Sequence, residues 1–131
     1  MAFEITLDGK TYPVRMRMTA ACRYEEKTGR SLTALDENPA IFGNGRDIPL
    51  NAGRFVAFVH SIMEDGCYPA KLELTTEDVA NLIPFRDDEL TAQLARVYIM
   101  ERFHMDEIAY AKLLEATAQK KTEIQNQTSP G

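Results

Sequence analysis

The chain has 131 residues, which is enough for one domain with a hydrophobic core. Hydrophobic residues make up 44% of it and charged residues 27%, the proportions of an ordinary globular protein rather than a disordered one. The net charge is -5 and no block of basic residues occurs, which argues against nucleic acid as the main partner.

The composition also argues against a membrane or secreted protein. The apolar runs are all much shorter than the roughly 20 residues that cross a bilayer. We expect no secretory signal, because the N-terminus lacks a charged start followed by an apolar stretch. Cys22 and Cys67 have no metal-binding or redox spacing, so we expect two free thiols in a reducing compartment.

The N-terminal residues have the pattern of a β-hairpin. Apolar residues alternate with polar ones at Phe3, Ile5 and Leu7, and again at Tyr12, Val14, Met16 and Met18. Asp8-Gly9 between them is typical of a tight two-residue turn. Pro13 cannot donate a backbone hydrogen bond, so it should lie at a sheet edge. A lone hairpin is marginal in water, so we expect it to pack on helices, the nearest being the helix predicted from Thr19.

The segment Thr19–Leu35 predicts a helix, a sharp corner and a short second helix. Thr19 has the hydroxyl of an N-cap residue. Four residues share one face of the first helix: Ala20, Ala21, Tyr24 and Thr28. Gly29 suits the left-handed residue that ends a helix, and Ser31 can cap a short helix that carries Leu32 and Leu35.

Residues 36–49 predict a long loop, since they contain two prolines and two glycines between periodic segments. Ile41 and Phe42 could attach this loop to the core. Loops of such length are either ordinary insertions or functional contacts, and both alternatives stay open here.

The clearest helix of the chain follows Asn51, which can cap it, with Leu50 and Phe55 placed as a hydrophobic staple. Its apolar residues recur at helical spacing: Phe55, Phe58, Val59, Ile62 and Met63. Burying one such side chain contributes on the order of 1.5–3 kcal/mol, so we expect this stripe to be the centre of the core. Gly66 should end the helix, and His60, away from the stripe, should be solvated.

Two more helix starts follow. Thr75 and Asp78 have the spacing of a capping box before a brief helix that stops at Pro84; its apolar residues are Val79, Leu82 and Ile83. Asp87, Asp88 and Glu89 stand where the next helix begins. Three carboxylates in a row could form a metal or acid–base site. We favour the simpler explanation that they offset the helix dipole.

From Asp87 to about Gln125 the chain has neither glycine nor proline, and it carries two apolar stripes. One consists of Leu90, Leu94, Val97, Tyr98, Met105 and Ile108. The opposite one consists of Ile99, Phe103, Tyr110, Leu113 and Leu114. A small two-layer domain cannot bury both sides of one helix. Either the helix breaks near His104 and its later half turns a face inward, or it continues and offers the second stripe to another chain.

Together these patterns predict an α+β fold that is mostly helical, with an N-terminal β-hairpin packed on a bundle of about four to five helices. We expect residues 1–119 to form a single α+β domain. The polar residues 120–131 should form a disordered tail.

No pattern in the chain indicates catalysis. The sequence lacks a Gly-rich phosphate loop, a Ser-His-Asp set and a His/Cys cluster with metal spacing. We therefore expect no enzymatic activity, no metal and no cofactor. An enzyme with a site assembled from dispersed residues stays open as an alternative. So does a small DNA-binding regulator, although Glu25 and Glu26 on the first helix do not suit a recognition helix.

The N-terminal quarter of the chain adds a resemblance. Two strands within Phe3–Val14, joined at Asp8-Gly9-Lys10, precede a helix and corner at Tyr24–Leu35 with the sequence Tyr-Glu-Glu-Lys-Thr-Gly-Arg-Ser-Leu. This arrangement resembles the tail assembly chaperones of long-tailed bacteriophages and of related gene-transfer-agent-like particles. The family has no catalytic motif to carry over.

The resemblance implies a small helical factor of the host cytoplasm. Such a factor binds the tape-measure protein and tail-tube subunits, guides tail assembly and leaves before the virion is complete. The resemblance also implies self-association and a longer form made by translational frameshifting. Shielding an apolar client needs exposed apolar surface. The residues we assign to that surface are those of the second stripe, Ile99, Phe103, Tyr110, Leu113 and Leu114.

Overall fold

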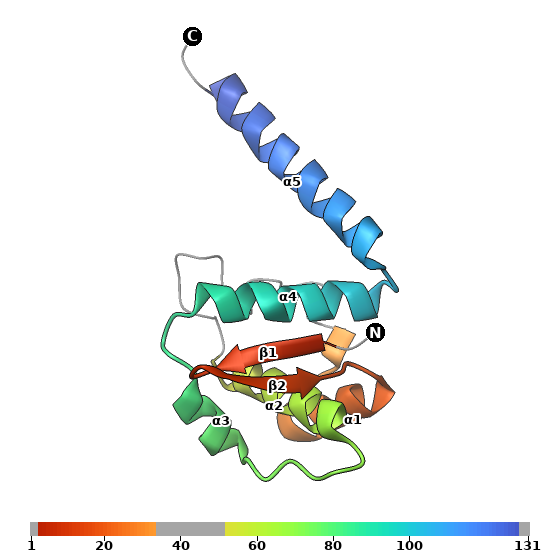
Figure 1. Cartoon of the computed structure of the whole chain (residues 1–131), viewed down its shortest axis with the longest axis vertical. Coiled ribbons are helices and arrows are strands. Elements are labelled where there is room, and N and C mark those ends of the chain that lie inside the picture. Colours follow the sequence, from red (N-terminus) through yellow and green to blue (C-terminus); the bar gives the residue numbers. More distant parts are fainter. Residues whose placement is uncertain (1–2, 34–51, 129–131) are drawn as a thin grey trace. The chain divides into compact units, whose positions relative to one another are not determined.

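The computed structural model describes residues 3–33 and 52–128, with side chains through residue 118. Its elements are β1 (Phe3–Leu7), β2 (Lys10–Val14), α1 (Met18–Thr28), α2 (Ala52–Cys67), α3 (Thr76–Leu82), α4 (Asp88–Arg102) and α5 (Glu107–Thr128) (Figure 1). A hairpin followed by helices confirms the predicted α+β, mostly helical fold. The chain divides into two compact units, Met1–Tyr98 and Ile99–Gly131, and the division falls inside α4.

The hairpin forms as its sequence predicts. The two strands are antiparallel, with Phe3 opposite Val14 and Leu7 opposite Lys10. Asp8 and Gly9 have φ values of 51° and 77°, the left-handed conformations of a two-residue turn that matches the strand twist. The side chains that face the core are buried: Phe3, Ile5, Leu7 and Val14.

The returning strand is shorter than predicted. β2 ends at Val14, so the alternation does not continue as a strand through Met16 and Met18. Met16 is buried in the connection to α1, whereas Met18 is the first residue of α1 and is exposed. The helix begins there because the backbone turns at Arg17, which the sequence pattern did not mark.

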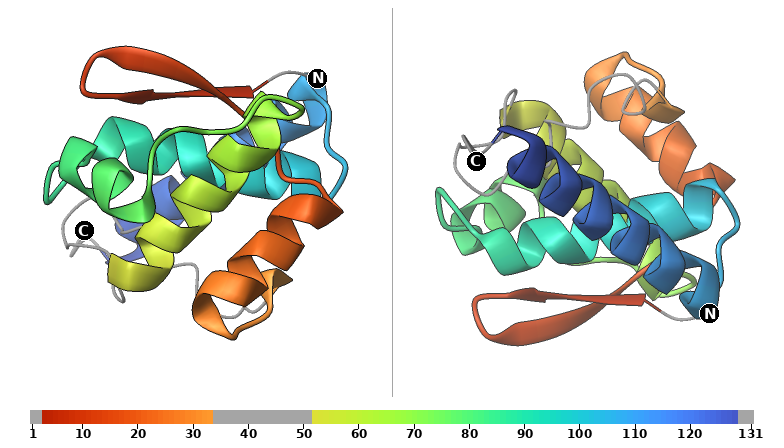
Figure 2. Two further views of the ribbon diagram at one scale, coloured as in Figure 1. Left: turned by 90° about the horizontal axis from the view of Figure 1, so that it is seen from below. Right: turned by 90° about the horizontal axis from the view of Figure 1, so that it is seen from above.

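The hairpin packs mainly on α2, and not on α1 as expected (Figure 2). The N–H of Arg15 donates to the carbonyl of Ile62 at 3.1 Å. On β1, the N–H of Thr6 donates to Oε1 of Gln93 in α4 at 2.9 Å. These bonds satisfy backbone groups that a two-stranded sheet leaves unpaired at its edges.

Gly66 explains how β2 approaches α2 so closely. A Cβ atom at this position would lie 2.3 Å from the carbonyl oxygen of Pro13 and 2.5 Å from Cα of Val14. Gly66 was predicted to end the helix, but α2 continues to Cys67. The glycine is therefore needed for backbone approach rather than for a helix stop.

The two ends of α1 differ in how well the sequence predicted them. The N-cap is Arg17 with no side-chain capping bond, so the prediction of Thr19 was wrong. Gly29, with φ of 69°, ends the helix in the left-handed conformation, as predicted. Beyond it, a single 3-10 turn holds the buried Leu32. Leu35 lies outside the described residues.

Helix α2 provides the centre of the core. Its five predicted stripe residues are at most 4% exposed, which confirms the prediction. Buried residues of the other elements of the first unit complete this core: Ala20, Tyr24, Val79, Leu90, Leu94, Val97 and Tyr98. The rings of Phe58 and Tyr98 meet edge to face, with centroids 6.1 Å apart. The predicted cap of α2 at Asn51 and Leu50, and the loop 36–49 with Ile41 and Phe42, lie outside the described residues.

The start of α3 is capped as predicted, and the start of α4 is capped as well. Oγ1 of Thr75 accepts from the N–H of Asp78 at 3.1 Å, and Oδ2 of Asp78 accepts from the N–H of Thr75 at 2.9 Å. Oδ1 of Asp87 accepts from the N–H of Leu90 at 3.0 Å. Asp87 is thus a cap that the sequence did not indicate, and Asp88 and Glu89 lie in the first turn of α4, where the prediction that they offset the helix dipole places them.

The long C-terminal segment breaks near His104, as one of the two alternatives predicted. The second part of that alternative, a later half that turns an apolar face inward, was wrong, because Ile108, Leu113 and Leu114 are exposed. His104 has φ of 53°, and the N–H of Met105 donates to the carbonyl of Met100 at 2.9 Å, the bond of a left-handed helix end. Oδ1 of Asp106 then accepts from the N–H of Ala109 at 2.8 Å and caps α5. Helix α5 runs to Thr128, so the expected boundary between domain and tail at residue 119 falls inside a helix. No helix in the described ranges combines the length and the apolar character needed to cross a membrane.

Two glycines of α2 give a matched test of this packing. We expect Gly66→Ala to destabilise the protein by about 3 kcal/mol, because the new Cβ meets backbone atoms that cannot move aside cheaply. Gly53→Ala meets open space and should instead stabilise by up to about 1 kcal/mol through helix propensity. Urea unfolding measures both, and equal effects of the two substitutions would contradict the proposed role of Gly66.

Candidate functional site

The five residues assigned to a client surface all lie in the second unit, but the break divides them. Ile99, in α4, is half-buried, and Phe103 directly after α4 is 53% exposed. Tyr110 is half-buried in α5, while Leu113 and Leu114 are 37% and 52% exposed. The last three share one face of α5 at helical spacing. The predicted single stripe is therefore two shorter groups.

Ile108 is a further exposed residue of this unit, and the sequence analysis had assigned it to the opposite face. It is 68% exposed, although it was grouped with Leu90 and Leu94, which are buried in α4. The break at His104 changes the helical register between α4 and α5, so the two halves of that stripe do not continue each other. We name the exposed apolar residues Phe103, Ile108, Leu113 and Leu114 the α5 apolar group.

A second concentration of functional groups lies between α1 and α2, and the sequence analysis missed it. Its centre is the carboxylate of Asp65, which is 1% exposed. Oδ2 accepts from the backbone N–H of Arg17 at 2.9 Å and from its Nε at 3.1 Å. Oδ1 accepts from Nη2 of Arg17 at 3.3 Å and from the hydroxyl of Thr19. The carboxylate thus has four donors, one for each of its lone-pair positions.

Glu64 is the neighbouring acidic residue, and it faces different partners. Its Oε1 lies 2.5 Å from Nζ of Lys27 and 2.9 Å from Nδ1 of His60. The contact with Nδ1 is electrostatic, because its geometry does not make a hydrogen bond. Nζ of Lys27 also donates to Oγ of Ser61 at 3.1 Å. This group links the last turn of α1 to the same turn of α2 that holds Asp65.

His60 is buried, so the expectation of a solvated histidine was wrong. Its Nε2 donates to the carbonyl of Leu74 at 2.8 Å, since a carbonyl only accepts. The bond fastens the segment before α3 to α2. The burial of His60 and its bond to Leu74 both require residues 68–75 to fold back along α2. A helical wheel of α2 alone does not show this.

The pKa values of both carboxylates are lowered. Burial by itself raises the pKa of Asp65, but the hydrogen bonds from Thr19 and Arg17 and the charge of Arg17 together outweigh it. For Glu64 burial again raises the pKa, and the hydrogen bond and charge of Lys27, with the charges of His60 and Arg23, lower it below 4.5. Both groups are therefore anions at neutral pH and serve as acceptors.

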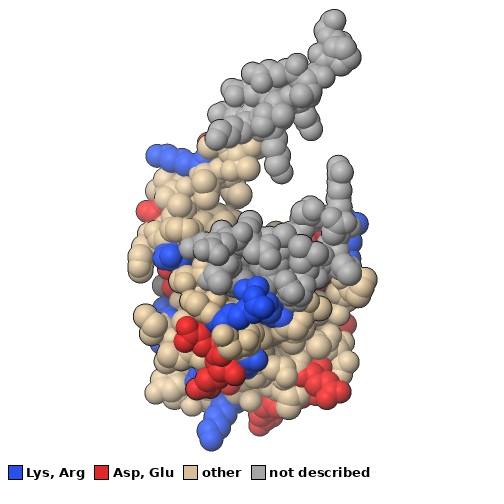
Figure 3. Space-filling view, turned by 180° about the vertical axis from the view of Figure 1, so that it is seen from behind, with Lys and Arg blue, Asp and Glu red and all other residues tan. Residues whose placement is uncertain are grey.

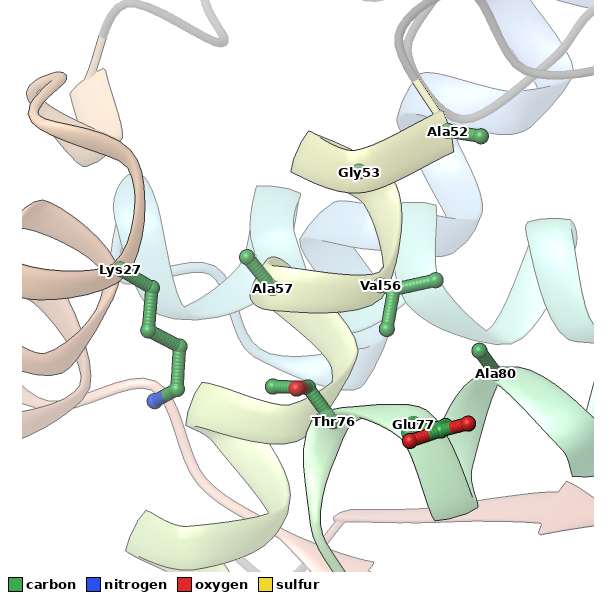
Figure 4. Close-up of a pocket in the computed structure, with 8 residues that line it drawn as sticks. All are labelled: Lys27, Ala52, Gly53, Val56, Ala57, Thr76, Glu77 and Ala80. Atoms are coloured by element: carbon green, nitrogen blue, oxygen red, sulfur yellow. The ribbon is translucent and has the colours of Figure 1, made fainter.

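A hollow of ≈ 520 Å³ lies between α1, α2 and α3. Its floor consists of small apolar side chains, and Lys27 and Glu77 stand at its edges (Figure 4). The amino group of Lys27 is already bonded to Ser61 and Glu64. Among the residues that the structure describes, none brings a converging acid, base or nucleophile to this hollow, the combination that a catalytic site needs.

Other kinds of site leave no trace in the described part of the chain. No group of three His, Cys, Asp or Glu side chains there could hold a metal ion. Cys22 and Cys67 are free thiols. On the face shown in Figure 3, acidic and basic side chains are interspersed, unlike a continuous basic surface that follows a phosphate backbone.

One signal in the sequence could have located Asp65. It lies three residues after Ile62 and seven after Phe58, in register with the buried stripe of α2. A carboxylate on a buried helix face needs donors, and the sequence offers several, among them Arg17, Arg23 and Lys27. Which of them reaches it depends on the tertiary structure.

Comparisons with family models, with curated proteins and with solved structures return no match. The resemblance to tail assembly chaperones therefore stands on the residues Phe3–Val14 and Tyr24–Leu35 alone.

The lowered pKa values predict acid-sensitive stability. Both folded-state pKa values lie below the ordinary values of 3.8 for Asp65 and 4.5 for Glu64. Their contribution to the free energy of unfolding is therefore complete above pH 4.5 and is lost as the pH falls through the folded-state values. Asp65→Asn should cost about 3 kcal/mol at pH 7, because it leaves Arg17 without its buried partner, and should flatten the acid dependence.

The measurement is urea unfolding at a series of pH values between neutral and strongly acidic. Glu77→Gln, which changes an exposed carboxylate on α3, is the matched control and should keep the wild-type slope. If Asp65→Asn unfolds with the same pH slope as the wild type, Asp65 is not the group that links stability to pH.

Proposed function

We propose that this protein is a phage tail assembly chaperone. In this role it binds the tape-measure protein and tail-tube subunits during tail assembly and makes or breaks no covalent bond. The observation that carries the proposal is the α5 apolar group, whose members are 37–68% exposed. Leu113 and Leu114 are neighbours on α5, and adjacent exposed apolar side chains are typical of protein-binding surfaces.

The exposure of α5 as a whole supports a binding role. Residues 111–118 are all exposed, so none of the side chains in this stretch of helix is buried. Most of the stability of a protein helix comes from packing one of its faces against another element. A partner that covers the face of Tyr110, Leu113 and Leu114 would supply that packing.

The chemistry of the first unit also fits a binding protein. The ionisable groups that gather there, around Asp65 and Glu64, are bonded to one another and hold α1 against α2. Ionisable groups that are paired with one another in this manner stabilise the fold and are not free to act as proton donors or nucleophiles.

The rest of the proposal follows the family resemblance. The protein would act in the host cytoplasm, associate with itself along a long client, and be absent from the mature virion. A longer frameshifted form would carry the same first unit. If the gene lies between a tail-tube gene and a very long tape-measure gene, the proposal gains support, whereas a position among metabolic genes would count against it.

The direct test is co-expression with a helical fragment of the tape-measure protein. We expect the wild-type chain to raise the soluble fraction of the fragment severalfold, and the double variant Phe103→Ser, Leu114→Ser to lose most of this effect by removing apolar contact area. Phe85→Ser, which changes a 78% exposed aromatic of the first unit, is the matched control and should act as the wild type does.

Circular dichroism of the purified variants shows whether the double variant is still folded. A fragment whose solubility does not change with the wild-type chain would refute the chaperone proposal. If Phe85→Ser lowers the soluble fraction of the fragment as much as the double variant does, the α5 apolar group is not the client surface.

A further inference from the structure

A polar pocket of ≈ 330 Å³ lies beside the Asp65 cluster, on the first unit. It is bounded by Arg23 of α1, Glu64 of α2 and the residues 68–72 that follow α2. The α5 apolar group has no part in it. Binding in this pocket would therefore be independent of client binding by the α5 apolar group. The charged residues of the lining determine which ligands the pocket can accept.

Arg23 is held in place without using its hydrogen-bond donors. Its Nε lies 3.9 Å from Oε2 of Glu64 and its Nη1 lies 4.0 Å from Oδ1 of Asp65, too far for hydrogen bonds. Asp65 cannot accept more, because Arg17 and Thr19 occupy its four acceptor positions. Two carboxylates thus fix the guanidinium by charge and leave its directional N–H groups for another acceptor.

One nitrogen of Arg23 is buried without a hydrogen-bond acceptor among the residues that the structure describes, which is unusual in a folded protein. Nη1 is buried and has no hydrogen-bond partner within the described residues, although the side chain as a whole is 30% exposed. Buried donors without acceptors are uncommon in proteins and usually have a reason in binding or in ordered solvent. Arg23 is one of the residues that line the pocket.

Lys71 adds a second positive charge to the pocket lining. It is exposed and forms no ion pair with any residue of the described ranges. Glu64 is the one acidic residue in the lining, and Lys27 at 2.5 Å balances its charge. Although the whole chain has a net charge of -5, this pocket therefore has an excess of positive charge.

We propose that this pocket binds a peptide carboxylate, either an acidic side chain or a free C-terminus of a partner protein. A carboxylate supplies acceptors only, which matches the unused donors of Arg23, and the charge of Lys71 attracts it. The excess positive charge would also attract a phosphate dianion, so the affinities of the two anions have to be compared directly. Tyr68 and Leu72 provide apolar contact for the chain that carries the carboxylate.

This inference does not rest on the proposed chaperone function. The residues that would hold the carboxylate lie in the first unit, whereas the α5 apolar group lies in the second. A failure of carboxylate binding would leave the co-expression test unaffected, and the reverse also holds.

The test is to titrate the full chain with peptide and phosphate probes. The NMR chemical shifts of the backbone amides at 70–72 and of the Arg23 Nε–H report the binding. The probes are a blocked pentapeptide with a central Glu, its Gln counterpart, an unblocked pentapeptide without acidic side chains, and inorganic phosphate. We expect saturable shifts with the Glu peptide or the unblocked peptide, and these two arms separate a side chain from a C-terminus. The Gln peptide should give no saturable shift.

Two substitutions assign the binding to the pocket. Arg23→Gln should weaken it about tenfold, the effect of losing a charged hydrogen bond. Lys71→Gln should weaken it about threefold through loss of a partly screened charge, and because this side chain is exposed the fold should not change. Arg86→Gln, which changes an exposed arginine paired with Asp88, is the control and should leave binding unchanged.

Several results would overturn the proposal. Equal binding of the Gln peptide would show that no carboxylate is recognised. Displacement of the Glu peptide by phosphate at a lower concentration would assign the pocket to phosphate instead. Unchanged affinity in folded Lys71→Gln, together with unchanged affinity in Arg23→Gln, would place the binding elsewhere on the molecule.

Discussion

The buried carboxylate of Asp65 is the interaction on which the first unit depends. It receives four hydrogen bonds, all from the start of α1 and the residue before it, 46 to 48 positions earlier in the sequence. A buried charge without partners would cost several kcal/mol, so the fold is stable only when Arg17 and Thr19 are in place. That requirement fixes where β2 ends and where α1 begins.

The residues on either side of Asp65 connect two more parts of the same unit. Glu64 pairs with Lys27 farther along α1, and Gly66 leaves room for the backbone of Pro13 and Val14. One turn of α2 thus positions both the hairpin and α1. The same turn also fixes Arg23 between two carboxylates, which leaves its donors available to the neighbouring pocket. The proposed carboxylate site is therefore a consequence of how the unit is held together.

The second unit follows a different principle. Its helices are separated by a left-handed residue, His104, and by the cap at Asp106, both of which depend on local backbone bonding. Four of its large apolar residues, Phe103, Ile108, Leu113 and Leu114, are exposed instead of forming a core of the kind that α2 provides. Such a surface gains free energy by covering apolar parts of another protein, since the hydrophobic effect is non-directional. The proposed chaperone function uses this property, and it leaves the first unit free to recognise a charged group.

The sequence by itself determined the features that depend on neighbours a few positions away. The Asp8-Gly9 turn, the left-handed Gly29, the capping box of Thr75 and Asp78 and the buried stripe of α2 all follow from local backbone preference or helical spacing. Only the tertiary structure decided the roles of Arg17, His60, Asp65 and Gly66, and how α5 continues after the break. Their partners lie far away in the chain, and a helical pattern gives the direction of a side chain but not the element that it meets.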